Sequence, residues 1–301
     1  MPSQPLTVRW GQFAGLNNRV DAPEVPQAET RYVYKPPYLS RARNIDLDSQ
    51  GRPRRRPGYT LKLAGNYHSL YSSGDLCVAV AGGYLTQIYR DWTTRIIRGG
   101  MGSDTVSYAR VNNLAFYSNP VAIGYLSEDG TNHGFADPAM NFKVAPFPGK
   151  FIEWYRGRLY IAKGNTLWFT DPLHLRIDMR KGFKQLPTPI VMVKAVDDGI
   201  FVSDEEATYF ISGPSPEKMR LDRKEDAAIE GTGIVINANK IKGEAQGRAL
   251  LFATKNGICV GMGNGSLKNV TGDNYQMPDV SRGASIVQDS ADTSKLIMRL
   301  Y

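Results

Sequence analysis

The chain has 301 residues, of which 42% are hydrophobic and 22% charged, so it belongs to the globular class and can bury a sizeable core. No apolar run approaches the roughly 20 residues that a membrane-spanning helix needs, and the first 18 residues lack the pattern of a signal peptide. We therefore expect a soluble protein. Cys77 and Cys259 lie in apolar runs, which favours small buried side chains in a reducing compartment over a disulfide framework.

The positive charge is concentrated near the N-terminus. The net charge is +8, and residues 1–64 hold 11 Lys and Arg against 5 Asp and Glu, whereas the remainder is nearly balanced. Six prolines in residues 1–40 favour an extended conformation over a helix. The aromatic residues among them favour docking over disorder. We therefore expect residues 1–58 to form an extended arm that docks on its own domain or on a neighbouring subunit.

This N-terminal arm contains the candidate partner-binding site. An arginine cluster of this kind suits phosphates or an acidic protein surface, and a solvated basic loop is the alternative that the sequence leaves open. The candidate partner-binding residues are Trp10, Phe13, Arg41, Arg43, Arg52, Arg54, Arg55 and Arg56.

From residue 59 onward, short apolar and aromatic runs alternate with turns rich in Gly, Asn and Asp, which is typical of β-strands. Five units share the order strand, tight turn, strand, shorter turn, strand. They span residues 67–89, 105–127, 150–170, 190–212 and 249–271. The turns after the first strands fall at Gly74, Asn113, Gly157, Gly199 and Gly257, with spacings of 39, 44, 42 and 58 residues.

Three of these spacings suit one antiparallel propeller blade, which takes roughly 40–50 residues. We therefore predict an all-β fold, a β-propeller of about five blades in residues 59–301, with an insertion near 213–248. Within it, 221–230 is the one stretch expected to make a helical turn or two. A β-sandwich is disfavoured because the units resemble one another in order and size. Ring closure is expected from a hairpin in 283–301 or from a strand at 59–65, since each blade leaves an exposed edge.

No arrangement of residues in the sequence points to catalysis. The histidines are His68, His133 and His174, and none has a second His or Cys at metal-ligand spacing. His174 lies near carboxylates, but we expect a loop residue rather than the base of a nucleophilic triad. The G-x-G-x-G run from Gly261 lies between two strands, so a hairpin turn is expected rather than a phosphate loop. We expect no enzyme activity, no cofactor and no metal.

Aromatic and acidic side chains in the repeats have structural interpretations that we prefer. We expect packing between blades, with carbohydrate stacking as the alternative, for Trp92, Trp154, Tyr155, Tyr160, Trp168 and Phe169. The acidic pairs Asp197/Asp198 and Glu205/Glu206 occupy turns or strand ends, where solvation is the default.

Several phrases resemble virion proteins of tailed bacteriophages. The leader WGQFAGLNNRVDAPEV (10–25), followed by ARNIDLDSQGRPRRRPGYTLKL (42–63), is similar to the N-terminal region of tail-associated propellers. These include the nozzle and packaged-DNA-stabilisation proteins of short-tailed phages and smaller relatives in long-tailed phages. Phrases in 154–172, 196–216 and 253–275 are similar in kind. The chain is much shorter than the nozzle proteins, which leaves a tail-tip or baseplate position open.

The resemblance implies a structural virion component that assembles in or on a ring of the tail. Its implied partners are other tail proteins and further copies of itself in cyclic symmetry, with a contact to the DNA passage as a further option. The implied location is the virion tail, after synthesis in the host cytoplasm. The alternatives are a receptor- or glycan-binding propeller of the tail, and a propeller glycosidase with paired carboxylates.

Overall fold

The computed structural model describes residues 15–19, 38–39, 41, 45–48, 50–56, 58–241, 246–272, 274–289 and 294–301. In these residues the regular structure is almost entirely β, with two single-turn 3₁₀ helices, η1 (Pro216–Lys218) and η2 (Ala238–Lys240). None of the helices described is long and apolar enough to cross a membrane. The all-β prediction is therefore confirmed.

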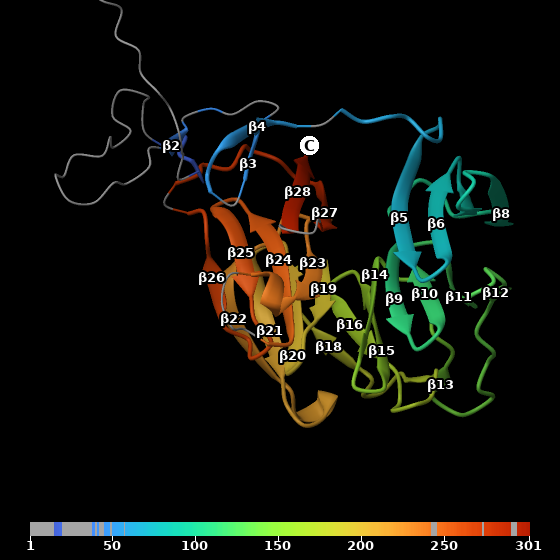
Figure 1. Cartoon of the computed structure of the whole chain (residues 1–301). Coiled ribbons are helices and arrows are strands. Elements are labelled where there is room, and N and C mark those ends of the chain that lie inside the picture. The colour runs from blue at the N-terminus through green and yellow to red at the C-terminus, as the bar shows by residue number, and fades with distance from the viewer. Residues whose placement is uncertain are drawn as a thin grey trace, which may run out of the picture.

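Five four-stranded antiparallel sheets follow one another along the chain, as Figure 1 shows from cyan to orange. The first two sheets are β5 (Tyr67–Ser73), β6 (Leu76–Ala81), β7 (Tyr84–Ile88), β8 (Thr94–Arg98) and β9 (Ser107–Val111), β10 (Leu114–Ser118), β11 (Ile123–Leu126), β12 (Asn132–His133). The third is β14 (Phe151–Tyr155), β15 (Arg158–Lys163), β16 (Thr166–Phe169), β18 (Phe183–Gln185). The last two are β19 (Ile190–Ala195), β20 (Gly199–Asp204), β21 (Ala207–Ser212), β22 (Arg220–Asp226) and β23 (Ile234–Asn237), β24 (Arg248–Thr254), β25 (Gly257–Gly261), β26 (Leu267–Asn269).

Four two-stranded sheets accompany these five. They are the C-terminal hairpin β27 (Gly283–Asp289) and β28 (Ser294–Leu300), the N-terminal hairpin β3 (Ile45–Leu47) and β4 (Pro53–Arg55), the parallel pair β1 (Gly15–Leu16) and β2 (Tyr38–Leu39), and the pair β13 (Lys143–Val144) and β17 (Ile177–Asp178).

Tight turns give each sheet its meander order. Between β14 and β15, Arg156 and Gly157 have φ of 44° and 73°, the positive values at both central positions that a type I′ hairpin turn requires. The turn after β25 closes through the Met262 and Gly265 amides, which donate to Ser266 and Met262 carbonyls, and Gly265 has a φ of 83°. The G-x-G-x-G run is therefore a hairpin turn between strands, as predicted.

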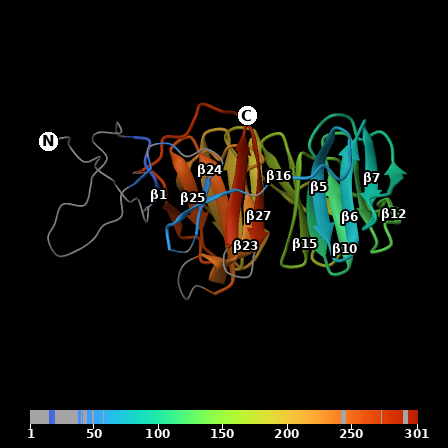
Figure 2. The same ribbon diagram turned by 45° about the horizontal axis from the view of Figure 1, so that its top comes forward.

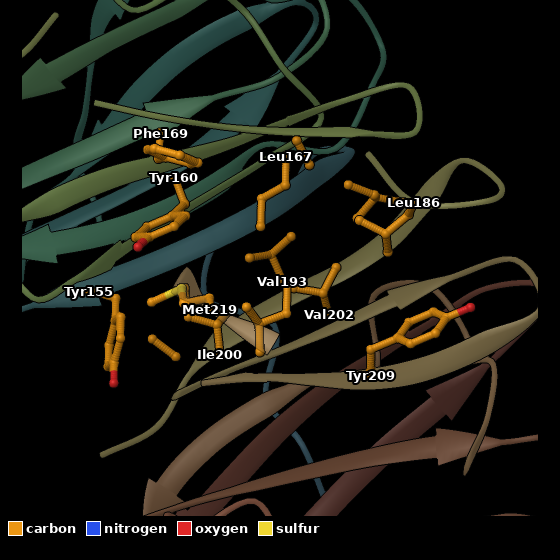
Figure 3. Close-up of a cluster of buried hydrophobic side chains, with 14 of the residues drawn as sticks. Tyr155, Tyr160, Leu167, Phe169, Leu186, Val193, Ile200, Val202, Tyr209 and Met219 are labelled. Atoms are coloured by element: carbon orange, nitrogen blue, oxygen red, sulfur yellow. The ribbon is translucent and has the colours of Figure 1, made fainter. Parts of the chain in front are cut away.

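The sheets pack face to face in chain order, and each junction is an apolar cluster. Side chains alternate between the faces of a strand, so on β10 Ala115 and Tyr117 pack against the first sheet while Phe116 packs against the third. We call the face that packs on the preceding sheet the leading face, and the opposite one the trailing face. Figure 3 shows the junction of the third and fourth sheets, where Tyr160 and Leu167 meet Val193 and its neighbours.

The innermost strands of successive sheets lie side by side, which is the arrangement of a β-propeller. One ion pair joins residues next to the third and fifth sheets and so spans the fourth. Nζ of Lys150, which precedes β14, lies 2.7 Å from Oε2 of Glu230, which precedes β23. The Glu230 carbonyl in turn accepts the Gly283 amide at the start of β27. The predicted propeller fold is confirmed, and the hairpin predicted in 283–301 is present as β27 and β28.

The fifth predicted unit begins at the second strand of its sheet in the structure, whereas the other four begin at the first strand. Gly257 lies between the second and third strands of its sheet, whereas the other four turns follow a first strand. The long spacing before it arises because that interval contains five strands of the four-stranded sheets, whereas each of the other intervals contains four. Residues 213–248 hold β22 and β23, so this segment is part of the fourth and fifth sheets rather than an insertion.

Three smaller expectations differ from the structure for physical reasons. Residues 221–226 form an outer strand rather than helical turns, because pairing with β21 supplies their backbone hydrogen bonds. Residues 59–65 form no strand. Trp92 lies outside the strands, in the turn between β7 and β8, where it is 49% exposed with a φ of 69° and does not pack between blades.

Candidate partner-binding surface

The N-terminal hairpin β3–β4 gathers four of the eight predicted binding residues. Its turn is built by Asp48, whose Oδ1 accepts the Gln50 and Arg52 amides at 2.9 Å each, and by Gly51 with a φ of 75°. The hydrogen bond from the Arg52 amide is the main cause that lowers the pKa of Asp48. Asp48 and Gly51 therefore fix a tight turn from which the arginines of β4 project.

A carboxylate at the centre of this hairpin fastens it to the C-terminal hairpin. Asp46 Oδ1 accepts Nε and Nη2 of Arg56 at 3.0 and 2.9 Å, and its Oδ2 lies 3.0 Å from Nζ of Lys295 on β28. The hydrogen bonds from Lys295 and then Arg56 hold the pKa of Asp46 below its usual value. Asp46 in return raises the pKa of Arg56. One acidic side chain thus joins segments from opposite ends of the chain.

The remaining arginines of the hairpin point into solvent. Arg54 is 72% exposed while its Nη2 lies 3.2 Å from Asp48 Oδ2. Arg52 and Arg55 are also exposed, and so is Arg41, which precedes the hairpin. The structure therefore brings Arg52, Arg54, Arg55 and Arg56 together on one turn-and-strand unit. Trp10, Phe13 and Arg43 lie outside the described residues.

A second anchor attaches the arm to the fifth sheet. Asn18 binds the segment after β26 in three ways, since its amide donates to the Asn274 carbonyl, its Nδ2 donates to the Gln276 carbonyl, and its Oδ1 accepts the Gln276 amide at 2.7 Å. Sequence reasoning missed Asn18, Asp46 and Lys295. The Asn-Asn pair after Gly15–Leu16 was the available signal, whereas nothing in the sequence connects Asp46 to Lys295. In its described parts the arm docks on its own chain.

The described acidic residues serve mostly in turns and ion pairs. Asp197 accepts the backbone amide of Arg248 at 2.7 Å and lies 3.2 Å from its Nε, which braces the fourth sheet against the fifth. Burial raises the pKa of Glu153 on β14, with Lys194 opposing the shift. Glu153 Oε1 accepts the Trp154 amide. Among the residues that the structure describes, no three His, Cys, Asp or Glu side chains are grouped as a metal site would require.

A hollow of about 350 Å³ lies at the turn end of the first two sheets. Its polar lining includes Asp75, Arg110, Glu128 and Asp129. Asp129 is occupied with its own turn, because its carboxylate accepts the Thr131 amide and hydroxyl, which lowers the pKa of Asp129 to about 2. We therefore regard the arginine-bearing hairpin as the better candidate site.

Comparison with known proteins gives a likeness at the level of fold. No protein-family model matches the sequence, and no curated protein matches it. Solved structures that align with the chain include the Neurospora crassa Pan2 WD40 domain, with 9% identity, a TM-score of 0.48 and coverage of 77% of this chain and 74% of that one. Virginiamycin B lyase of Staphylococcus aureus aligns with 11% identity, a TM-score of 0.48 and coverage of 77% and 83%. A Xanthomonas campestris gluconolactonase aligns with 10% identity, a TM-score of 0.42 and coverage of 75% and 82%.

Proposed function

We propose that this propeller is a non-catalytic structural subunit of a bacteriophage tail, which assembles in or on a ring at the nozzle, tail tip or baseplate. The observation that carries the proposal is the arginine-bearing hairpin. It is anchored to the rest of the molecule at Asp46, so that Arg52, Arg54 and Arg55 project into solvent from a fixed base. The phrases in 10–25 and 42–63, which resemble tail-associated propellers, support the same role.

The exposed arginines suit contact with an anionic partner. A guanidinium binds carboxylates and phosphates through two parallel hydrogen bonds, and a fixed strand spares some of the ordering cost of binding. In a tail, the partner with this chemistry is an acidic surface of a neighbouring tail protein. The DNA that passes through the tail is the other anion available to such a surface.

The proposal is tested by gene replacement in the phage that encodes the chain. Particles that lack the protein should fail to complete tails, and the wild-type gene supplied in trans should restore them. The triple variant R52E/R54E/R55E should fold but not restore infectivity. The matched control R90E/K181E/K255E changes three exposed residues on turns elsewhere by the same total charge and should restore it. Complete, infectious tails without the protein would refute the proposal.

A glycan-binding role is the second candidate, and one exposed side chain favours it. Trp92 projects from the β7–β8 turn at 49% exposure, and Tyr89 beside it is 39% exposed. Exposed aromatic rings of this kind stack on sugar faces. Binding of the isolated protein to a glycan array, lost in Trp92→Ala, would support this role. An empty array would leave the scaffold role as the interpretation.

A further inference from the structure

The series of sheets has one free face at each end. Every sheet from the second to the fifth packs both its leading and its trailing face in apolar clusters. The first sheet packs its trailing face on the second, and the C-terminal hairpin β27–β28 packs its leading face on the fifth. Among the described residues, no buried cluster joins the C-terminal hairpin to the first sheet.

The free leading face of the first sheet exposes large apolar side chains. Tyr71, Val78 and Leu85 belong to the cluster with the second sheet, so their strand neighbours point the other way. On the leading face lie Leu70 and Tyr84, which are 64% and 48% exposed. Ile96, which pairs with Thr86 on the same face, is 63% exposed. These three side chains come from β5, β7 and β8, while Ala79 and Thr86 on the same face are buried between them.

The free trailing face of the C-terminal hairpin is its counterpart. Met298 and Leu300 pack in the cluster with the fifth sheet. The cross-strand pair Ile286 and Ile297 lies on the opposite face, where Ile286 is 56% exposed. The N-terminal hairpin reaches this face through Lys295, near the tip of the C-terminal hairpin, and still leaves Ile286 exposed.

These two faces are complementary, because they are the same two kinds of face that pack together at every junction within the chain. All five junctions within the chain join the trailing face of one unit to the leading face of the next. Among the described residues, one leading face and one trailing face are left without such a junction. The segment between β4 and β5 runs from the side of the C-terminal hairpin to β5 (Figures 1 and 2). Two of its apolar side chains, Tyr59 and Leu61, are 80% and 78% exposed and so bury little of either face.

We propose that a second copy of this chain occupies these faces: the trailing face of the C-terminal hairpin of one copy packs on the leading face of the first sheet of the next. Such a contact is heterologous, and repetition closes it into a ring if the rotation between copies permits. This inference rests on the proposed role as an assembling subunit, for which it names the interface. The large exposed apolar surfaces are then explained as interface rather than as an aggregation hazard.

The test uses two full-length variants that each remove one face. Ile286→Asp places a carboxylate on the trailing face, and Ile96→Asp places one on the leading face. Mass is measured by sedimentation over a range of concentrations. Each variant alone should need roughly 100-fold more protein than the wild type to assemble, or more. Val121→Asp, at a site that is also 56% exposed but lies outside both faces, should assemble like the wild type.

Mixing the variants gives the sharper result. The Ile286→Asp chain keeps an intact leading face and the Ile96→Asp chain keeps an intact trailing face, so the pair retains one working junction. An equimolar mixture should therefore form dimers and nothing larger. A mixture that behaves like the separate variants would overturn the head-to-tail interface.

The rival outcome is that the ring closes within one chain. Alkylation of Cys77 distinguishes this outcome from assembly of several copies. Cys77 on β6 pairs with Ser72 on the leading face and is half-buried, whereas Cys259 is fully buried and serves as the reference. If copies assemble, dilution of the wild type should expose Cys77 to alkylation. A labelling rate that is independent of concentration, with a monomeric mass, would overturn the inference. Wild-type assembly that neither variant weakens would overturn it too, and would leave the tail role to be judged by infectivity.

Discussion

Loss of the Asp46 charge should release the N-terminal hairpin from the C-terminal hairpin. In Asp46→Asn the side chain keeps its shape but loses its ionic bonds to Arg56 and Lys295. The side chains of these two partners are 40% and 38% exposed, so solvent screening reduces each contribution to about 0.5–1 kcal/mol. Together they stabilise the docked hairpin by about 1–2 kcal/mol.

Limited proteolysis measures this directly, because trypsin cleaves after Arg54 and Arg55 only when β4 leaves its hairpin. When opening is fast relative to cleavage, the cleavage rate follows the open population. A change of 1–2 kcal/mol should speed cleavage by about 5–30-fold. Asp75→Asn is the control, since Asp75 and its partner Arg90 are 82% and 90% exposed. Equal cleavage rates for Asp46→Asn and the wild type would refute the anchoring role.

The same anchor should depend on pH in one direction. Hydrogen bonds from Lys295 and Arg56 depress the pKa of Asp46 in the folded protein. The stabilisation is therefore complete above the unfolded-chain pKa of about 3.9, and it is lost as the pH falls through the lower, folded pKa. Amide exchange in the hairpin should differ between wild type and Asp46→Asn at neutral pH and converge in acid.

Three further substitutions, with Gly74→Ala as a comparison for the last, test the packing and the second anchor. Phe252→Ala empties a fully buried site between the fourth and fifth sheets and should cost about 3–5 kcal/mol in urea unfolding; a cost below about 1 kcal/mol would contradict the observed packing. Asn18→Ala should accelerate amide exchange in the segment that its side chain binds without changing global stability. Gly265→Ala should destabilise strongly, since a Cβ there would meet the ring of Phe210 at a φ of 83°, whereas Gly74→Ala meets no atom within 4 Å and should cost about 1–2 kcal/mol.

The candidate site was partly visible in the sequence. The run RPRRRPG after a turn motif located Arg52 to Arg56, because turn chemistry and charge are local properties. The docking of that hairpin depends on Asp46 and Lys295, which are 249 residues apart in sequence. Their meeting follows from where the fold places β28, and no local pattern encodes it.

The sequence by itself determined three strands of each four-stranded sheet, their order and the propeller architecture, because alternating apolar residues and tight turns are set by near neighbours. Outer strands such as β22 were missed, since RLDRKED is exposed and its strand conformation comes from pairing with β21. Only the tertiary structure decided the phase of the fifth sheet and the packing partner of each face. It also left the faces that carry Ile96 and Ile286 uncovered. Burial depends on neighbours that are distant along the chain, and the free faces at the two ends are a property of the whole series of sheets.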